Sequence, residues 1–278
     1  MSPIVALLTD FGLQDNYVGV MKAVMSRITA DVRFIDITHQ IQPQNVRQAS
    51  LTLLNSYRYF APSTVFLVVV DPGVGGSRKC IAAEAGGYRF VAPDNGVLSF
   101  VLEELGSASI VELQNPAYRL SDVSNTFHGR DVFAPAAAHL AAGVALGELG
   151  PRVERIAQQM KPQLRIEAGQ ISGQVMHIDR FGNVITSIGQ LSWNEQGLLL
   201  QPRFNRGLAA TVIPAAQVSV AVKDATLFGI RRSYSEVSKG QLLALVDSSG
   251  FLEIACNQGS AATLLGVNGG ESVVLKTG

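Results

Sequence analysis

A change of hydrophobic pattern near Leu149 constrains the fold more than any other feature of this chain. Before it, apolar runs such as IVALLT and STVFLVVV alternate with segments such as NYVGVMKAVMSRI, whose apolar residues recur at helical spacing. Continuous runs of β-branched and aromatic residues are typical of strands that are covered on both faces. Residues 1–150 are therefore predicted to form an α/β domain, in which helices cover both faces of a mostly parallel sheet.

The segment after this change has no long stretch of helical periodicity. Residues 151–167 contain Pro151, Pro162 and charges of both signs, and they are interpreted as a linker. Short alternating runs follow, among them ISGQVMHID, QVSVAV, FLEIAC and ESVVLK. Such runs predict a smaller, antiparallel β-barrel domain over residues 168–278.

Charge and cysteine content narrow the classes of function. The 22 basic and 22 acidic residues balance, so no basic excess indicates a nucleic acid or an anionic membrane as partner. No apolar run approaches the ~20 residues of a membrane span, and the first residues lack the basic region of a signal peptide. Cys80 and Cys256 are too few for a disulfide framework and have no CxxC spacing, so a reducing, cytoplasmic setting is expected.

Two aspartates follow predicted strands of the α/β domain. Asp10 ends the stretch LLTD, and Asp71 ends VFLVVVD. Because ligands of open α/β sheets bind beyond the carboxyl ends of the strands, both carboxylates are expected at one rim. Either aspartate alone is as readily explained by a turn or a helix cap, but matching positions on two strands favour a functional site.

The glycine-rich loop after Asp71 fits neither of two common phosphate-binding motifs. Gly73 and Gly75 begin a GxGxxG pattern, but Arg78 stands where the third glycine is required, and the Walker A spacing also fails at Arg78. The loop instead predicts that Arg78 folds back onto Asp71. An arginine beside a carboxylate keeps that carboxylate ionised.

His128 precedes a predicted helix with the sequence GRDVFAPAAAHLAAGVA. The positive end of a helix dipole favours a neutral imidazole, and Gly129 permits a ligand to approach closely. The alternative is a histidine that only enters a helix. His39, His139 and His177 lie in or after regular elements, and no HxH or HExxH spacing predicts a metal site.

A tight turn in the β domain carries a second group of candidates. The stretch HIDRFGNVITS places Asp179, Phe181 and Asn183 around Gly182. A plain hairpin turn is one interpretation. The other is a loop that offers a carboxylate, an aromatic ring and an amide, which suits an amino group and a purine. The stretch VDSSGFLEIACNQGSA adds two serines and Asn257 on loops between strands.

Taken in order, these segments resemble one family. The matching stretches include LLTDFGLQDNYVGVMKA, DITHQI, VVVDPGVGG followed by Arg78, VAPDNGVLS, TFHGRD, IDRFGNVITS, SYSEV and SSGFLEIA, and they span both predicted domains. The set is similar to the adenosine-forming S-adenosyl-L-methionine (SAM) hydrolases, also called SAM hydroxide adenosyltransferases, which are relatives of fluorinating and chlorinating enzymes. The resemblance implies the reaction of SAM with water to adenosine and L-methionine, without a metal or organic cofactor. It also implies a homotrimer whose active sites each lie between the α/β domain of one subunit and the β domain of its neighbour.

The resemblance also implies a catalytic triad of Asp71, Arg78 and His128, which binds one water next to C5′ of the ribose. Water has a pKa of ~15.7, so it must lose a proton during the attack, whereas the sulfonium charge already activates the leaving methionine. The residues leave open how Asp71 and His128 divide the proton transfer. The interpretation favoured by the sequence is that Arg78 weakens Asp71 as a base, so that Asp71 orients the water and His128 takes its proton.

The substrate-binding residues implied by the same resemblance come from both domains. Asp10 falls where the ribose hydroxyls are held. Asp179 and Ser248 fall near the amino and carboxylate groups of the methionine, Asn183 falls beside the adenine, and Tyr234 stacks on the purine.

Three alternative functions are weaker. A SAM-dependent halogenase uses a serine where this chain has Gly129, and it lacks the aspartate and histidine of the triad. A non-catalytic protein that binds SAM or adenosine needs the same pocket without turnover. An NAD-dependent oxidoreductase is disfavoured by the incomplete GxGxxG pattern and by the β domain.

Overall fold

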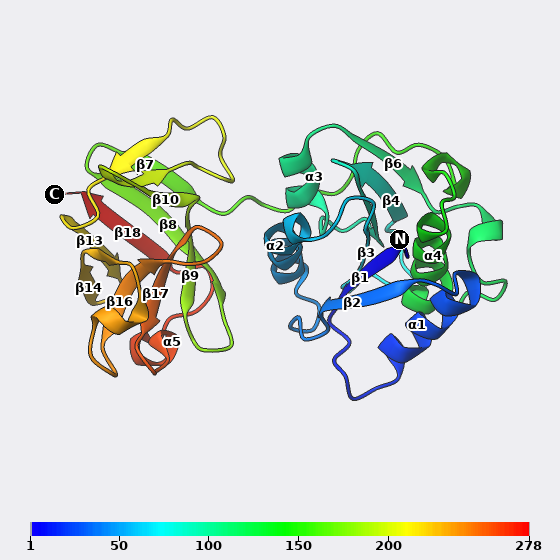
Figure 1. Cartoon of the computed structure of the whole chain (residues 1–278), viewed down its shortest axis with the longest axis horizontal. Helices are drawn as coiled ribbons and strands as arrows, with labels where there is room; N and C mark the ends of the chain where they lie inside the picture. The colour runs from blue at the N-terminus through cyan, green and yellow to red at the C-terminus, as the bar shows by residue number, and fades with distance from the viewer. Residues whose placement is uncertain (1, 278) are drawn as a thin grey trace. The chain divides into compact units, whose positions relative to one another are not determined.

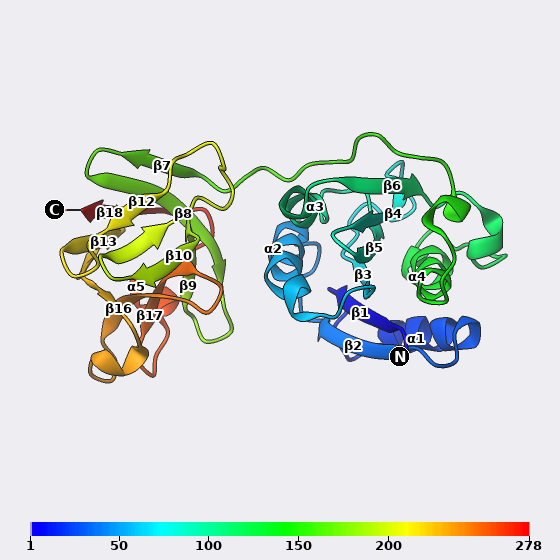
Figure 2. The same ribbon diagram turned by 45° about the horizontal axis from the view of Figure 1, so that its top comes forward.

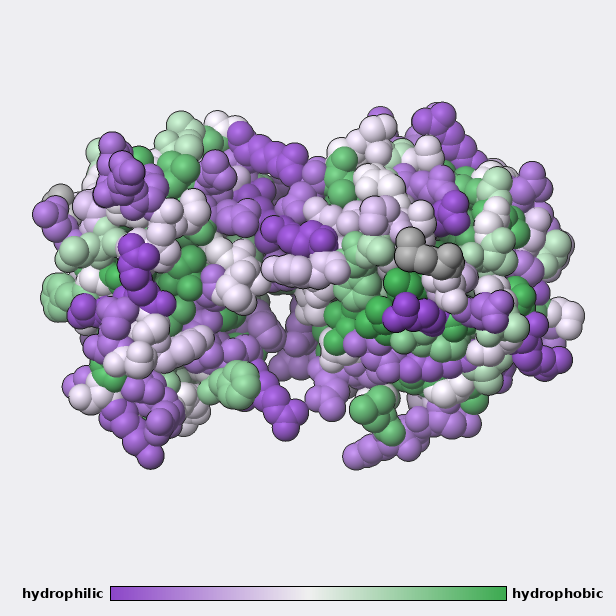
Figure 3. All heavy atoms as spheres, viewed as in Figure 1, coloured by the Kyte–Doolittle hydropathy of each residue, from purple (hydrophilic) through white to green (hydrophobic). Residues whose placement is uncertain are grey.

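The computed structural model describes residues 2–277, and the chain divides into two compact units, Met1–Gln159 and Met160–Gly278 (Figure 1). The first unit mixes strands and helices, and the second consists almost wholly of strands. No helix within residues 2–277 is long and apolar enough to cross a membrane. Figure 3 shows hydrophilic side chains spread over both units, with smaller hydrophobic areas interspersed among them.

The α/β unit is built on a six-stranded sheet with the order β2-β1-β3-β5-β4-β6. Neighbours among β2, β1, β3 and β5 run parallel, while β4 is antiparallel to both β5 and β6. The predicted fold class, an α/β domain with a mostly parallel sheet, is confirmed. The strands are β1 (Ile4–Thr9), β2 (Arg33–Thr38), β3 (Val65–Val69), β4 (Cys80–Ala85), β5 (Tyr88–Pro93) and β6 (Ala108–Glu112).

Helices cover both faces of this sheet. Figure 2 shows α2 and α3 on one face and α1 and α4 on the other. Helix α1 buries Val18, Met21 and Met25, which its helical spacing places on one side. The helices are α1 (Tyr17–Ile28), α2 (Val46–Ser56), α3 (Ser99–Leu105) and α4 (Ala134–Ala141), and short 3₁₀ turns lie at Tyr57–Tyr59, Pro116–Tyr118 and Leu146–Leu149.

The register of β1 and β3 determines which residues follow the two strands at the carboxyl edge of the sheet. Thr9 lies opposite Val69, the last residue of β3. The chain therefore leaves both strands at the same level, Asp10 directly after β1 and Asp71 two residues after β3. Because β3 is buried along its whole length, its end is held by the core.

The β unit is formed mainly by one large sheet that curls into a nearly closed, barrel-like shape (Figure 1). Its order is β14-β13-β18-β8-β9-β17-β16-β15, with β7 paired to β8, and β10, β11 and β12 form a separate small sheet. Alternate residues of β8 and β13 are buried, as expected for strands with one face in a core. The strands are β7 (Leu164–Glu167), β8 (Gln170–Ile178), β9 (Val184–Gly189), β10 (Leu191–Asn194), β11 (Gly197–Leu200), β12 (Thr211–Ile213), β13 (Val218–Val222), β14 (Ala225–Phe228), β15 (Ile230–Arg231), β16 (Leu242–Val246), β17 (Phe251–Cys256) and β18 (Ser272–Thr277).

Two local expectations differ from the structure, and one short helix is added to what was expected. Strand β7 occupies the last four residues of the range 151–167, which was expected to be linker throughout, because Leu164 and Ile166 pair with β8. The long helix expected after His128 starts as a π-helical turn over Gly129–Phe133 and ends at Ala141. A short helix, α5 (Ala261–Leu265), follows β17 in the β unit.

Candidate functional site

Asp71 and Arg78 form a buried ion pair at the carboxyl edge of the sheet. Nε of Arg78 donates to both carboxylate oxygens of Asp71 at 3.0 Å, and Nη2 donates to Oδ2 at 2.5 Å. The side chains of Arg78 and Asp71 are only 10% and 5% exposed. Arg78 also lies over the buried ring of Phe133, with Cζ 5.6 Å from the ring centroid. Arg78 thus folds back onto Asp71, as expected from the sequence.

His128 joins this pair through the same guanidinium. Nη2 of Arg78 lies 2.8 Å from Nδ1 of His128. Since arginine can only donate, Nδ1 must accept, and a neutral imidazole then carries its proton on Nε2. Burial and, next, the Arg78 guanidinium lower the pKa of His128 below its ordinary value, so the ring is neutral at neutral pH. Among residues 2–277, Nε2 has no hydrogen-bond partner.

Cys80 completes the surroundings of Arg78. Nη1 of Arg78 donates to its sulfur at 3.3 Å, and Nδ1 of His128 lies 3.8 Å from the same atom. Burial raises the pKa of the Cys80 thiol, which keeps it protonated. No pattern in the sequence indicated this contact, because Cys80 begins a strand that was not predicted.

The glycine-rich loop brings Arg78 back to Asp71. Gly75 has a φ of 74°, in the left-handed region, and a Cβ there would meet the carbonyl oxygen of Asn125 well inside van der Waals contact. Asn125 precedes His128 by three residues. The close approach of these two loops therefore requires glycine at position 75.

Asp10, Asp71 and His128 line one cleft of about 400 Å³ in the α/β unit. Oδ2 of Asp10 accepts from the backbone N–H of Gln44 at 2.7 Å, and Oδ1 has no partner among the described residues. Asp10 therefore holds a loop in place and still presents an acceptor. The structure thus brings four of the predicted residues together, with Arg78 behind Asp71.

Aromatic rings that the sequence analysis did not single out form one wall of this cleft. Phe11, Tyr17 and Phe127 line it and contact one another, with ring centroids 5.1 to 5.9 Å apart. Phe11 and Tyr17 come from the same stretch, which runs from the end of β1 to the start of α1, whereas Phe127 lies more than 100 residues further along the chain, so no local pattern indicates that all three meet. The lining of the cleft therefore combines polar side chains with a cluster of aromatic rings.

In the β unit, Asp179 and Asn183 belong to one turn. Oδ1 of Asp179 accepts from the backbone N–H groups of Phe181 and Asn183 at 2.8 and 2.9 Å, and Oδ2 accepts from the Asn183 amide at 2.9 Å. The turn interpretation therefore accounts for much of the hydrogen bonding of Asp179. Phe181, Asn183 and Tyr234 line a cleft of about 460 Å³ in this unit.

Tyr234 is tied to a buried acid that the sequence analysis missed. Its hydroxyl donates to Oε1 of Glu253 at 2.8 Å, and Glu253 is 3% exposed. Burial raises the pKa of Glu253 to about 7, so at neutral pH this carboxyl is close to half protonated. Ser248 lies exposed in the turn between β16 and β17, and its side chain makes no hydrogen bond within residues 2–277.

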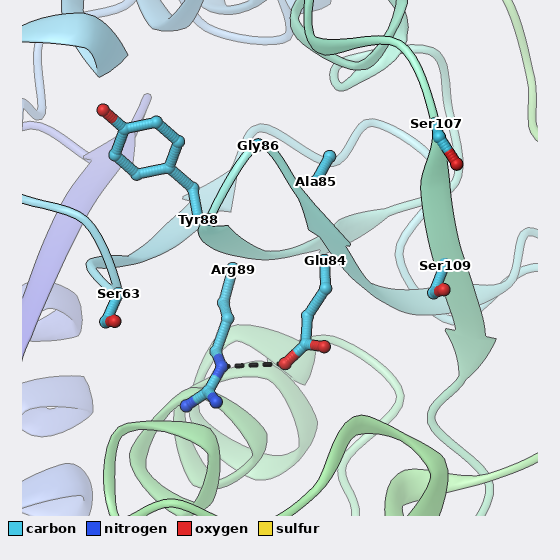
Figure 4. Close-up of a pocket in the computed structure, with 9 residues that line it drawn as sticks. Ser63, Glu84, Ala85, Gly86, Tyr88, Arg89, Ser107 and Ser109 are labelled. Carbon is cyan, nitrogen blue, oxygen red and sulfur yellow. Dashed lines mark hydrogen bonds and ion pairs between the residues drawn. The ribbon is translucent and has the colours of Figure 1, made fainter.

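A second cleft in the α/β unit lies at the opposite edge of the sheet (Figure 4). It surrounds the β4–β5 turn, near the first residues of the parallel strands β3 and β5. Arg89 there pairs with Glu84 at 2.9 Å and donates to the Leu140 carbonyl at 2.7 Å. These polar groups satisfy one another, and parallel sheets bind ligands at the other edge. No group of three or more His, Cys, Asp or Glu side chains in residues 2–277 is arranged to hold a metal ion.

The polar cleft at the ends of parallel strands defines a ligand-binding α/β protein with an added β unit. Residues 5–150 match the SAM hydroxide adenosyltransferase N-terminal domain, and residues 173–274 match the C-terminal domain. The chain therefore belongs to the SAM hydroxide adenosyltransferase family, as its sequence motifs predicted.

Relatives cover the whole chain. It is 39% identical over 280 residues to an (R)-S-adenosyl-L-methionine hydrolase of Salinispora tropica, covering 100% of this chain and 99% of the relative. A fluorinase of Nocardia brasiliensis is 27% identical and covers 99% of this chain and 97% of its own. The crystal structure of an uncharacterized conserved protein from Thermotoga maritima matches with a TM-score of 0.85 at 40% identity, covering 98% of this chain and 99% of that one.

We expect Gly75→Ala to disrupt the contact between Arg78 and His128. The added Cβ would push the loop of residues 71–78 away from Asn125, so substrate turnover should fall at least tenfold. Gly87→Ala is the matched control, because Gly87 also has a left-handed φ, 81°, but nothing lies within 4 Å of the place that a Cβ would take there. Both variants should lose about 1 kcal/mol of stability from backbone strain. Steady-state kinetics with thermal melting would check this, and equal activities would refute the tight-contact argument.

Proposed function

We propose that this protein hydrolyses SAM to adenosine and L-methionine. The observation that carries the proposal is the cleft in which Asp71, Arg78 and His128 form one hydrogen-bonded cluster beside Asp10. Such a cluster suits a bound water, since it offers acceptors and donors in fixed directions. The hydrolase relatives, similar over their full length, support the same reaction.

The proposed reaction is an in-line displacement at C5′ of the ribose. Water attacks C5′, the C5′–S bond breaks, its electron pair goes to sulfur, and neutral methionine leaves. Holding water, C5′ and sulfur in line can supply ~7–11 kcal/mol of the rate acceleration. Asp71 follows a strand that is buried along its whole length, which suits this positioning role.

The geometry favours a division of the proton transfer that differs from the one the sequence suggested. Nδ1 of His128 is occupied by Arg78, so Nε2 carries a hydrogen and can only donate. Asp71 is an acceptor with lone pairs left beyond those that bind Arg78. We therefore assign proton acceptance to Asp71, and orientation of the water to His128.

Variants at these two positions distinguish the two divisions. Asp71→Asn should lower kcat by about 10²- to 10⁴-fold, the usual contribution of a general base. His128→Gln keeps an N–H donor, so it should retain about tenfold more activity than His128→Ala. If His128 accepted the proton, Gln and Ala would be equally inactive. Single-turnover rates at saturating SAM would give the comparison.

We propose that the remaining predicted residues bind the substrate. Asp10 would accept hydrogen bonds from the ribose hydroxyls through its open oxygen. Asp179 and Ser248 would bind the amino and carboxylate groups of the methionine. Asn183 and Tyr234 would bind the adenine, which their shared cleft supports.

A SAM-dependent halogenase is the second candidate, favoured only by the fluorinase relatives. A Cβ at Gly129 would lie 3.1 Å from the Phe127 ring and 3.3 Å from Sδ of Met21, so a serine hydroxyl has little room there. A halide must also shed strongly bound water before it attacks, and the polar cluster does not favour that step. A non-catalytic SAM-binding protein would use the same cleft but would form no product.

Isotope labelling tests the function directly. In water enriched in heavy oxygen, mass spectrometry should find the label in adenosine and not in methionine. Unlabelled adenosine would exclude attack by water at C5′. A parallel reaction in high chloride should give no 5′-chloro product; such a product would favour the halogenase, and absence of any product would favour the binding protein. Formation of S-adenosylhomocysteine would indicate methyl transfer and contradict the proposal.

We further propose that the protein is a cytoplasmic homotrimer whose active sites combine the α/β unit of one subunit with the β unit of another. Both of its cysteines are free thiols, in keeping with a reducing compartment. Large apolar side chains are exposed on both units, and a subunit interface would cover such groups. They include Leu13, Tyr59, Phe181, Phe228 and Leu264.

Mixing two inactive variants tests the shared site. Asp71→Asn impairs the α/β unit and Asp179→Ala the β unit, so mixed trimers should contain some intact sites and regain activity. Subunit exchange would be verified by native mass spectrometry, and each variant exchanged with itself is the control. No recovery after exchange would mean that each site is built within one chain.

A further inference from the structure

A chain of four polar side chains lies behind the loop that carries Asp10, and the proposed reaction uses none of them. His39 follows β2 and is 3% exposed. Its Nδ1 lies 2.8 Å from Oγ1 of Thr9, and its Nε2 lies 3.1 Å from Oδ1 of Asp36. The other oxygen of Asp36 accepts from Nζ of Lys22 at 2.7 Å. The chain therefore runs from a surface lysine to the end of β1.

The donor directions in this chain are set by its two ends. Lys22 can only donate, so Asp36 is an acceptor, and a carboxylate beside Nε2 of His39 favours the tautomer with the proton on Nε2. The Nε2 contact lacks the alignment of a linear hydrogen bond, so its effect is mainly electrostatic. Nδ1 is then free to accept from the Thr9 hydroxyl. The oxygen of Thr9 in turn accepts from the backbone N–H of Phe11 at 3.2 Å.

These contacts hold the backbone on both sides of Asp10. Thr9 is the preceding residue, and the N–H of Gly12 donates to the carbonyl of His39 at 2.7 Å. The N–H of Gln44 donates to the Asp10 carboxylate itself at 2.7 Å. The loop after β1 is thus fastened to the loop after β2 at points before, at and after Asp10. A carboxylate on such a backbone has few directions open to it.

We propose that Thr9 and His39 are positioning residues that aim the Asp10 carboxylate at the ribose hydroxyls of an adenosyl ligand. The inference rests on the proposed function, because it takes the ribose as the ligand of Asp10. Thr9 and His39 do not touch the ligand in this arrangement; they act through the direction of Asp10. A histidine that only stabilises the fold would affect all ligands of the cleft alike.

The measurement that tests the positioning role is how much more tightly the protein binds a ribose with its 2′- and 3′-hydroxyls than a ribose without them. Calorimetry would give the dissociation constants of adenosine and 2′,3′-dideoxyadenosine for the full-length wild type and for each variant. Asp10→Ala should remove most of the wild-type preference for adenosine. Thr9→Val keeps the shape but loses the hydroxyl, and it should weaken adenosine binding about three- to tenfold while dideoxyadenosine binding stays unchanged. Thr9→Ser restores the hydroxyl and should restore the preference.

Two further variants keep the test decisive if Thr9→Val does not fold. Asp36→Asn removes the charge beside His39 from a side chain that is 41% exposed, and it should reduce the preference in the same way but less. Lys223→Met is the matched control, because it removes a partly exposed lysine–glutamate pair that lies outside this chain of side chains, and the preference should stay as in wild type.

The outcomes separate the two proposals. Two outcomes would overturn the positioning role and leave the proposed function standing. In the first, Thr9→Val weakens the binding of adenosine and dideoxyadenosine equally. In the second, Thr9→Val and Asp36→Asn both keep the full preference for adenosine, although Asp10→Ala has lost that preference. An unchanged preference in Asp10→Ala would refute ribose recognition by Asp10, and with it the positioning role. Product analysis with SAM tests the hydrolysis itself independently of these variants.

Discussion

The buried pair of Arg78 and Asp71 is the interaction on which the rest of the candidate site depends. A guanidinium that is almost fully removed from water must satisfy its donors, and it does so with Asp71, His128 and Cys80. Removing one partner of such a pair would leave a buried charge, which typically costs about 3–5 kcal/mol. The pair thereby joins the end of β3, the start of β4 and the segment before α4 into one rigid group.

Because arginine never accepts, this pair also sets the direction of every hydrogen bond around it. The contact with Arg78 fixes His128 in the tautomer that carries its hydrogen on Nε2 and donates from there. The sequence indicated that the three residues belong together, but it left open which of them takes the proton and only favoured His128. The tautomer depends on which nitrogen faces Arg78, and no spacing of residues along the chain contains that information.

Other parts of the fold were predictable because their cause is local. The apolar run of β3 and the helical periodicity of α1 reflect the burial of their side chains away from water. The ends of the strands could therefore be predicted from the sequence, and with them the edge of the sheet at which Asp10 and Asp71 lie. Strand β4 was missed since Glu84 interrupts a run of alanines that is short and weakly apolar. The contacts of Phe127 with Phe11 and Tyr17, and the hydrogen bond between Tyr234 and Glu253, join distant segments, for which a single sequence has no periodic signal.

The two clefts offer different groups to the proposed substrate. The cleft of the α/β unit holds a water-binding cluster and an acceptor for hydroxyls, and its lining also includes aromatic rings and Gln44. The cleft of the β unit combines Asn183 with the rings of Phe181 and Tyr234 but has no base beside an arginine. A ligand with a purine, a ribose and an amino acid matches the sum of the two sets. Large apolar side chains are exposed on both units, Tyr59 on the first and Phe181 on the second, and the homotrimer that we propose would cover such groups.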